Sequence, residues 1–316
     1  MKPVLKNLNS TALISNRNVR QIADGIRLRV LEYTLANNGG YLCQACSSAE
    51  ILATLYTRLM NLGPLDNPLL PGHFPGVPSN TNRVTLQGYL FNGPHAPHLD
   101  RFYLSPTHYS LVLYATLVET GRMAEDGLLE FNKDGGSVEM IGAEHSPGME
   151  VMTGSLGQGI SQAAGIALAR KLHKETGKNW IFMSDGELQP GQVWEAVQSM
   201  VFYKLGNIVI VVDVNGHQCD GTTASVMGIE PLEKRFDAFG CIVQRVNGHD
   251  SDALYRACRV PHKNRPLVVI GDTKPWQGIE ILKSRAPKFH YIRFKDAVER
   301  KKFEDVLKQM KTGLNK

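Results

Sequence analysis

The sequence lacks any apolar run long enough to cross a lipid bilayer. Its longest strongly apolar stretch, Ile208 to Val212, is far shorter than the roughly 20 residues that a membrane-spanning helix needs. The segment Met1 to Asn16 also lacks the continuous apolar core of a secretory signal peptide. We therefore expect no membrane contact and a cytoplasmic location.

Cysteine is scarce, with five residues in a chain of 316. An odd number of scattered cysteines argues against a disulfide framework. Cys43 and Cys46 have the spacing of a redox motif, but the sequence has no second such pair to complete a zinc site. We interpret both as small packing residues in a reducing compartment.

The sequence also lacks clustered cations interleaved with aromatic residues, which are typical of nucleic-acid-binding surfaces. The net charge of +5 is spread along the chain, except for a basic stretch from Arg293 to Lys316 that also carries four acidic residues. Such a mixed run is typical of a solvated helix face, so we expect no nucleic-acid partner.

The composition that remains is that of a globular protein. A hydrophobic fraction of 42% and a charged fraction of 21% are ordinary for a chain with a sizeable core, and we expect residues 1–316 to form a single domain. A Pro-rich excursion at about residues 63–100 is too broken for a long helix, and excursions of this length tend to be functional or partner-contacting. Its prolines are Pro64, Pro68, Pro71, Pro75, Pro78, Pro94 and Pro97.

Short β-rich runs alternate with helical patterns along most of the chain. This alternation predicts an α/β fold with a doubly wound parallel sheet, covered by helices on both faces. Ligands of such sheets bind beyond the carboxyl ends of the strands. The expected strands are residues 101–104, 180–183, 208–212, 240–246 and 267–271, and the expected helices include residues 22–35, 47–60, 109–119, 159–172 and 193–203.

Two polar turns directly follow expected strands. Asp185 and Asn215 lie in these turns, so both should emerge at the same edge of the sheet. One carboxylate and one amide oxygen leave positions open for phosphate oxygens and water on Mg²⁺, which prefers few carboxylates. Asp-Gly and Asn-Gly are also common turn dipeptides, so the metal interpretation needs a second motif.

The second motif is a glycine-rich loop, Thr153 to Gly159, at the start of an expected helix. Its three glycines let backbone N–H groups approach an anion at the positive end of that helix. The loop has neither the Lys-Ser/Thr ending of a P-loop nor the glycine order of a Rossmann fold. We therefore expect the anion to be held differently from that of ordinary NTPases or NAD enzymes.

Four segments, in the correct order, resemble the transketolase family over nearly the whole chain. Ser48 to Tyr56 resembles its N-terminal helix, and Leu104 to His108 (LSPTH) resembles its histidine-bearing LSKGH segment. Pro147 to Gly159 (PGMEVMTGSLGQG) is similar almost residue for residue to a hallmark loop of the family. Ser184 to Gly221 resembles its thiamin diphosphate signature, a GDG followed some thirty residues later by an Asn-containing turn.

The resemblance implies the N-terminal, diphosphate-binding subunit of a split transketolase. One-chain transketolases are about twice this length, and in the split enzymes a second polypeptide supplies the pyrimidine-binding half, with the glutamate that activates the aminopyrimidine ring. Thiamin diphosphate and Mg²⁺ would be the cofactors. A two-carbon ketol unit would pass from a ketose donor, expected to be phosphorylated, to an aldose acceptor. Two such chains would assemble with two partner chains.

The resemblance also assigns roles residue by residue. Asp185, Asn215 and the backbone carbonyl of His217 would hold Mg²⁺, while His108 and His290 would serve the proton transfers. The residues implied to contact the cofactor are His108, Gly154, Ser155, Leu156, Gly186, Glu187, Asn215 and Lys274.

Some positions depart from the family pattern. Tyr41 stands where the family's GHPGG segment has a histidine, and residues 140–142 replace a Gly-His-Pro. His145, His95 or His98 could compensate for the missing histidines. We expect retained cofactor chemistry with altered sugar recognition, and thus a non-standard ketose or sugar-like phosphorylated donor.

Two other functions stay open. A 2-oxo acid dehydrogenase subunit of the E1 type would use the same cofactor and release CO₂ from a 2-oxo acid. A non-catalytic scaffold of the same fold would explain the missing histidines, but it gives no physical reason to retain Asp185 and Asn215.

Overall fold

A computed structural model describes residues 17–314 of the chain. The expectation for Met1 to Asn16, and the last two residues of the basic C-terminal stretch, lie outside the described residues. Between residues 17 and 314, no helix combines the length and apolarity that crossing a bilayer would require.

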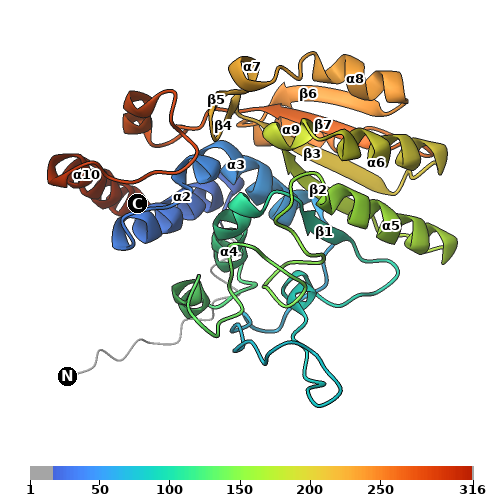
Figure 1. Cartoon of the computed structure of the whole chain (residues 1–316), viewed down its shortest axis with the longest axis horizontal. Coiled ribbons are helices and arrows are strands. Elements are labelled where there is room, and N and C mark those ends of the chain that lie inside the picture. The colour runs from blue at the N-terminus through green and yellow to red at the C-terminus, as the bar shows by residue number, and fades with distance from the viewer. Residues whose placement is uncertain (1–16, 315–316) are drawn as a thin grey trace.

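A five-stranded parallel sheet forms the centre of the molecule (Figure 1). Its strand order is β1-β2-β3-β7-β6. The strands are β1 (Arg101–Leu104), β2 (Asn179–Ser184), β3 (Ile208–Val214), β6 (Ile242–Asn247) and β7 (Leu267–Asp272). All five predicted strands are confirmed, with ends that differ by at most two residues.

Helices cover both faces of this sheet, as the doubly wound prediction requires. Alternate residues of β3 face opposite sides: Val209 and Val211 belong to one hydrophobic cluster, and Ile210 to another. The first cluster includes α2 (Val19–Ala36), α3 (Leu42–Thr54) and α4 (Ser110–Glu119). The second includes α5 (Gly159–Leu172), α6 (Gly191–Phe202) and α8 (Leu232–Phe239).

The start predicted for helix α3 was wrong. The Ser-Ser-Ala-Glu run suggested a cap at Ser47 or Ser48, but the helix begins at Leu42. Both serines lie inside the helix and are fully buried. Ser48 Oγ donates to the Gln44 carbonyl oxygen at 2.6 Å, and Ser47 Oγ donates to Asp213 at 2.5 Å. The Ser47 side chain, which the sequence suggested as a helix cap, therefore forms a hydrogen bond with β3 instead.

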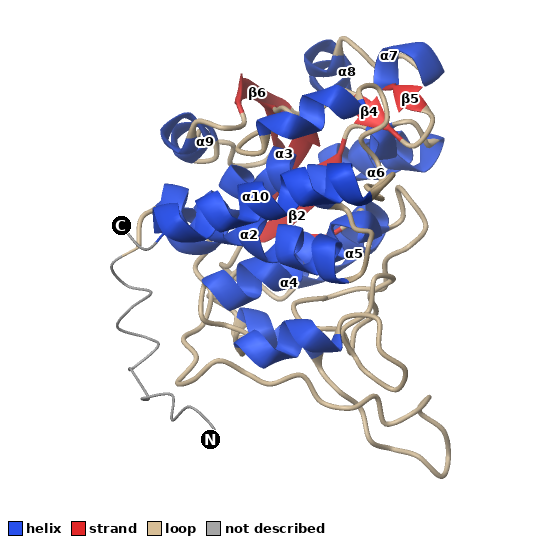
Figure 2. Cartoon of the chain, turned by 90° about the vertical axis from the view of Figure 1, so that its left-hand side faces the viewer, coloured by secondary structure: helices blue, strands red, loops and turns tan. Residues whose placement is uncertain are grey.

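The C-terminal helix α10 (Ala297–Leu314) is only partly the solvated helix that its charges predicted. Phe303 is buried in the core, and α10 contacts α2. Figure 2 shows the two helices side by side. Lys311 Nζ forms an ion pair with Glu32 of α2 at 2.5 Å, so charged residues line the edge of an apolar contact.

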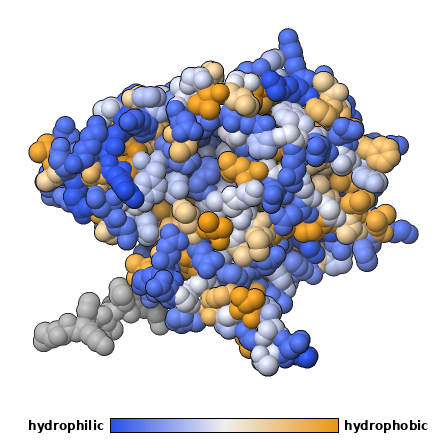
Figure 3. All heavy atoms as spheres, viewed as in Figure 1, coloured by the Kyte–Doolittle hydropathy of each residue, from blue (hydrophilic) through white to orange (hydrophobic). Residues whose placement is uncertain are grey.

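The Pro-rich excursion is irregular apart from a short 3₁₀ helix at Gly88–Asn92. It lies below the sheet in Figure 1. Arg122 fastens it by donating to the carbonyl oxygens of Phe91 and Gly63, each at 3.2 Å. Hydrophilic and hydrophobic side chains are interspersed over this face of the molecule (Figure 3).

The remaining described elements are short. They include the hairpin β4 (His217–Gln218) with β5 (Gly221–Thr222), and the helices α7 (Thr223–Val226) and α9 (Ser251–Ala257). The hairpin directly follows the turn after β3, so it lies at the edge of the sheet where ligands of this fold class bind.

Candidate active site

A cavity of about 420 Å³ lies at the carboxyl edge of the sheet. Its walls come from the segments that follow β1, β2, β3 and β7, together with the start of α3 and residues 289–290. The cavity brings together most of the residues singled out from the sequence: His108, Gly154, Leu156, Asp185, Gly186, Glu187, Asn215, His217 and His290.

Two of the candidate residues do not line this cavity. Ser155 is exposed beside the glycine-rich loop, while its neighbours Gly154 and Leu156 do line it. Lys274 is exposed, and its backbone N–H donates to His249 Nε2 at 2.8 Å. In this structure the following residue, Pro275, reaches the cavity instead.

Asp185 anchors the two turns that the sequence placed at the same edge. Its carboxylate accepts hydrogen bonds from the backbone N–H groups of Gly186 and Gly216, both at 2.8 Å, and from the Thr223 hydroxyl at 3.2 Å. Burial and the nearby Asp213 raise the pKa of Asp185 to about 7. A cation bound beside it would favour the ionised form.

Asn215 is held at both ends of its amide group. Its Oδ1 accepts from the His217 backbone N–H at 2.9 Å, and its Nδ2 donates to the Tyr109 hydroxyl at 3.1 Å. The Tyr109 hydroxyl in turn donates to Asp213 at 2.8 Å. Sequence reasoning missed Tyr109, because nothing in its position next to His108 indicated that its side chain reaches β3.

The glycine-rich loop adopts the backbone that its composition allows. Gly154 has φ +124° and Gly157 has φ +81°, values that residues with a Cβ rarely adopt. The Gly157 N–H donates to Glu187 at 3.0 Å, and the Ser105 hydroxyl donates to the same carboxylate. Burial raises the pKa of Glu187 to about 7. Glu187 thus ties the loop to β1 and to the turn after β2.

Aromatic rings form another wall of the cavity. Tyr41 lies with its ring centroid 6.1 Å from that of His108 and 5.5 Å from that of His290, and the two imidazoles are 5.2 Å apart. Burial, together with His290, lowers the pKa of His108 to about 3, and burial also lowers the pKa of His290. Both imidazoles are therefore neutral at pH 7, so each can donate and accept a hydrogen bond.

The charges around the cavity decide how it could hold an anion. Three carboxylates, Asp185, Glu187 and Asp220, line it, whereas no Lys or Arg is found among its described lining residues. A diphosphate bound here would need its charge offset by backbone N–H groups at a helix N-terminus and by a cation.

The oxygen atoms of three cavity residues would suit Mg²⁺ as ligands. The described residues contain no group of three or more His, Cys, Asp or Glu side chains that could hold a metal ion. One carboxylate, one amide oxygen and a backbone carbonyl form a hard-oxygen donor set that leaves room for phosphate and water, as Mg²⁺ prefers. Asp185, Asn215 and the carbonyl of His217 would provide that set.

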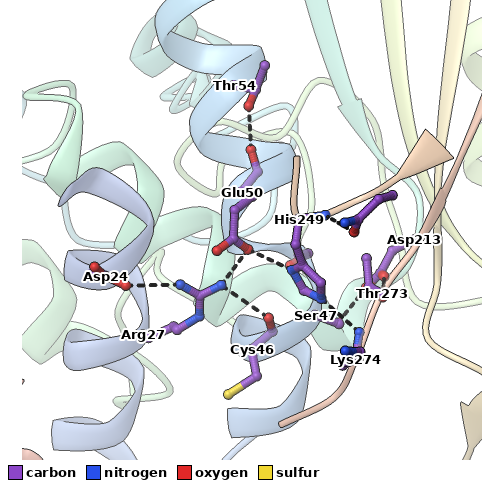
Figure 4. Close-up of polar contacts among 12 residues, drawn as sticks. Asp24, Arg27, Cys46, Ser47, Glu50, Thr54, Asp213, His249, Thr273 and Lys274 are labelled. Carbon is purple, nitrogen blue, oxygen red and sulfur yellow. Dashed lines mark hydrogen bonds and ion pairs between the residues drawn. The ribbon is translucent and has the colours of Figure 1, made fainter. Parts of the chain in front are cut away.

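A second polar network lies next to the residues that line the cavity and connects α2 and α3 to two later segments of the chain (Figure 4). Glu50 of α3 accepts from Arg27 of α2 and from His249 Nδ1, the latter at 3.0 Å. Asp213, fully buried, accepts from the hydroxyls of Ser47 and Thr273. Helices α2 and α3 are thereby joined to the segments after β6 and β7, one of which carries Pro275 to the cavity.

None of the three histidines that could have replaced the missing ones lines this cavity within the described chain. His145 pairs with Glu139 at 3.1 Å, and its ring lies 4.5 Å from that of Phe74. His95 stacks on Tyr89 with centroids 3.5 Å apart and pairs with Glu150 at 2.8 Å. Both fasten loops.

The cysteines Cys43 and Cys46 are free and buried, as the packing interpretation predicted. Burial raises the pKa of Cys46 to about 12 and that of Cys43 well above its ordinary value. Such thiols are poor nucleophiles.

Comparison with known proteins shows the family to which the chain belongs. The family model "Transketolase, thiamine diphosphate binding domain" matches residues 71–274. A putative uncharacterized transketolase family protein of Sinorhizobium fredii is 35% identical over 88% of this chain and 91% of its own length. An apulose-4-phosphate transketolase subunit of Actinobacillus succinogenes is 30% identical over 83% of this chain and 86% of its own length.

Other relatives are much longer. Human transketolase is 30% identical over 83% of this chain, which spans only 38% of that protein. The solved structure of transketolase from Campylobacter jejuni resembles 95% of this chain at a TM-score of 0.69 and 22% identity, and this chain covers 48% of it. This likeness concerns the fold, which is the thiamin diphosphate-binding α/β fold expected from the sequence. The chain belongs to the transketolase family and carries its thiamine diphosphate binding domain.

Proposed function

We propose that this chain is the diphosphate-binding subunit of a split transketolase. With a separate pyrimidine-binding subunit, thiamin diphosphate and Mg²⁺, it transfers a two-carbon ketol unit from a ketose donor to an aldose acceptor. One observation carries the proposal: a single cavity joins the oxygen donors Asp185 and Asn215, the Gly154 loop and the neutral imidazoles of His108 and His290. The similarity to relatives that are themselves named as transketolase subunits, over most of their length, supports the split arrangement.

The residues that line the cavity have different proposed roles. Asp185, Asn215 and the His217 carbonyl would hold Mg²⁺, and the glycine-rich loop, of which Gly154 and Leu156 line the cavity, would hold the diphosphate through backbone N–H groups. When bound, thiamin diphosphate supplies the nucleophilic carbon and the electron sink for C–C cleavage. His108 and His290, being neutral at pH 7, exchange hydrogen bonds with sugar hydroxyls and carry protons at their ring nitrogens.

The proposed donor is a non-standard, phosphorylated ketose. Tyr41 supports this, because it offers one hydroxyl where the family has an imidazole, and its bulkier ring stands beside His108 and His290. A donor panel assayed with the assembled enzyme tests it: xylulose 5-phosphate should not be strongly preferred over other ketose phosphates. The Tyr41→His variant should shift the preference toward xylulose 5-phosphate, and unchanged ratios of kcat/KM would contradict the role given to Tyr41.

Thermal unfolding with thiamin diphosphate and Mg²⁺ tests the function itself, using the full chain alone and with the chain that co-purifies with it. A ligand at 100 times its Kd stabilises the native state by ~2.7 kcal/mol, which a Tm shift reveals. We expect the largest shift when cofactor, Mg²⁺ and partner are all present. The absence of a shift in every mixture would sink the proposal and favour a non-catalytic scaffold. CO₂ release from pyruvate by the assembled enzyme would instead indicate an E1-type subunit.

A further inference from the structure

The Tyr109 hydroxyl lies between two side chains of the segment that ends β3. It donates to Asp213 at 2.8 Å and accepts from Asn215 Nδ2 at 3.1 Å. We propose that Tyr109 is a positioning residue that, together with the His217 backbone N–H, fixes the orientation of the Asn215 amide, so that its oxygen and not its nitrogen is available to the metal. The inference rests on the proposed function, which makes Asn215 a Mg²⁺ ligand.

The chemistry of the neighbours fixes the direction of each hydrogen bond. The Asp213 carboxylate accepts from three hydroxyls, those of Ser47, Thr273 and Tyr109, so the Tyr109 proton points to Asp213. The Tyr109 oxygen is left with acceptor capacity only, and the atom of Asn215 facing it must be the NH₂ group. At the other end, the His217 backbone N–H can only donate, so the atom facing it must be Oδ1.

Packing holds the tyrosine in place. Tyr109 is fully buried, and its ring makes a T-shaped contact with Phe182 of β2 at a centroid distance of 5.1 Å. It ends the 3₁₀ turn Thr107–Tyr109 that carries His108, immediately before α4. The hydroxyl therefore cannot follow the amide if the amide rotates, and a rotated amide would lose its acceptor.

The orientation matters because only one end of an amide binds Mg²⁺. The two ends of an Asn side chain have nearly the same shape, and an outward-facing NH₂ group would offer the cation no lone pair. Groups that orient metal ligands from behind typically change metal affinity 10–100-fold when they are removed.

The Tyr109→Phe variant tests this inference. We expect the Mg²⁺ concentration that gives half of the thermal shift, at saturating thiamin diphosphate, to rise about tenfold or more. Tyr103→Phe is the matched control, because Tyr103 is also fully buried and donates to an asparagine, Asn179, at 3.2 Å. It should lower the Tm of the unliganded chain without changing the Mg²⁺ requirement. Equal Mg²⁺ requirements in Tyr109→Phe and wild type would overturn the inference.

A double-mutant cycle separates positioning from general damage to the site. If Tyr109 acts through Asn215, adding Tyr109→Phe to Asn215→Ala should cause no further loss of Mg²⁺ affinity. An undiminished effect of Tyr109→Phe in the Asn215→Ala background would contradict the proposal.

The Asn215→Asp variant keeps the test open even if Tyr109→Phe fails to fold. It adds a charge that would ordinarily strengthen Mg²⁺ binding, but it faces Tyr109 with an oxygen that has no proton to donate. We expect its Mg²⁺ affinity not to exceed that of the wild type, and tighter binding would overturn the inference. A wild-type chain that shows no Mg²⁺-dependent response to thiamin diphosphate would refute the proposed function instead, so the two failures are distinguishable.

Discussion

Asp185 and Asn215 directly follow two neighbouring strands, but only Asp185 has an ionisable side chain. Replacing Asp185 by Ala removes the charged residue of the proposed Mg²⁺ site, so Mg²⁺-dependent retention of thiamin diphosphate should weaken by more than about 100-fold, or ~2.7 kcal/mol. Asn215→Ala removes the proposed neutral ligand and should weaken this retention by about tenfold. Equilibrium dialysis with labelled cofactor measures both. Asp237→Ala, which removes a carboxylate that is 77% exposed, is the control. Unchanged retention in Asp185→Ala would remove the metal assignment.

His108 should leave a signature in the pH dependence of stability. Its pKa is lowered to about 3 in the folded state, by burial and by His290, and is about 6.5 when unfolded. The unfolded chain therefore binds the extra proton between these pH values, so His108 costs stability as the pH falls below about 6.5. His108→Gln should make the free energy of unfolding fall less steeply with decreasing pH, by up to ~1.4 kcal/mol per pH unit.

Urea unfolding between pH 6.5 and 4.5 measures that slope. His173→Gln replaces an exposed histidine outside the cavity and should leave the slope as it is in the wild type. Equal slopes for His108→Gln and wild type would show that His108 is not held neutral by its surroundings.

At single positions, resemblance to the family motifs identified some residues that do not line the cavity and missed others that do. Lys274 and Ser155 lie in segments that reach the cavity, yet both side chains are exposed outside it, because the backbone of each segment delivers a neighbouring residue. Tyr109 and Phe289 line the cavity without having been predicted. Sequence spacing identifies which turn reaches the site, but packing decides which side chain of that turn enters it.

At the scale of the elements, α3 makes buried polar contacts to other parts of the chain. Glu50 of α3 is 9% exposed and is the buried partner of Arg27, which is 2% exposed. Glu50→Gln keeps the shape but leaves the Arg27 charge with Asp24 alone, at 3.2 Å and near the surface. Because breaking a buried pair from one side costs roughly 3–5 kcal/mol, we expect a loss of about 3 kcal/mol in unfolding free energy.

The control for this loss is an exposed pair of the same type. Glu130 and Lys133 are 3.2 Å apart with side chains 43% and 57% exposed, and Glu130→Gln should change stability by less than about 0.5 kcal/mol. Burial would raise the pKa of Glu50, but hydrogen bonds from His249 and Arg27 lower it below its ordinary range. The ionised Glu50 therefore contributes to the free energy of unfolding above about pH 4.3, and this contribution disappears as the pH falls through the folded-state pKa. The difference in unfolding free energy between Glu50→Gln and wild type should accordingly shrink in acid.

The elements themselves were largely predictable because apolar β-rich runs and helical periodicity are local signals. All five strands of the sheet carry them. The start of α3 was not predictable, since Ser47 and Ser48 satisfy their hydroxyls inside the helix, one of them on Asp213 of a distant strand. The buried face of α10 was not predicted either, because charged residues dominate its sequence. Its Phe303 contacts a core that forms only on folding.

For the whole molecule, the edge of the sheet unites motifs that are far apart in the chain. The turn after β2, the turn after β3 and the glycine-rich loop each look ordinary alone, and together they surround one cavity. The order of strands puts β2 and β3 side by side at the centre, so the Asp185 and Asn215 turns are adjacent, and the Gly216 N–H joins them at 2.8 Å. This arrangement supports the proposed site for a diphosphate and a cation. The proposed function needs a second chain for the rest of the cofactor.

That requirement gives a prediction about assembly. With this chain at fixed concentration, ketol transfer should be absent without the partner, should rise as the partner is added, and should saturate at one partner per chain. Sedimentation equilibrium should then give the mass of two chains of each kind. The Asp185→Ala chain is the control: its substitution lies inside the cavity, so it should assemble with the partner normally while its mixture stays inactive. Activity of this chain alone, or saturation at half an equivalent of partner, would contradict a site completed once per chain by a second subunit.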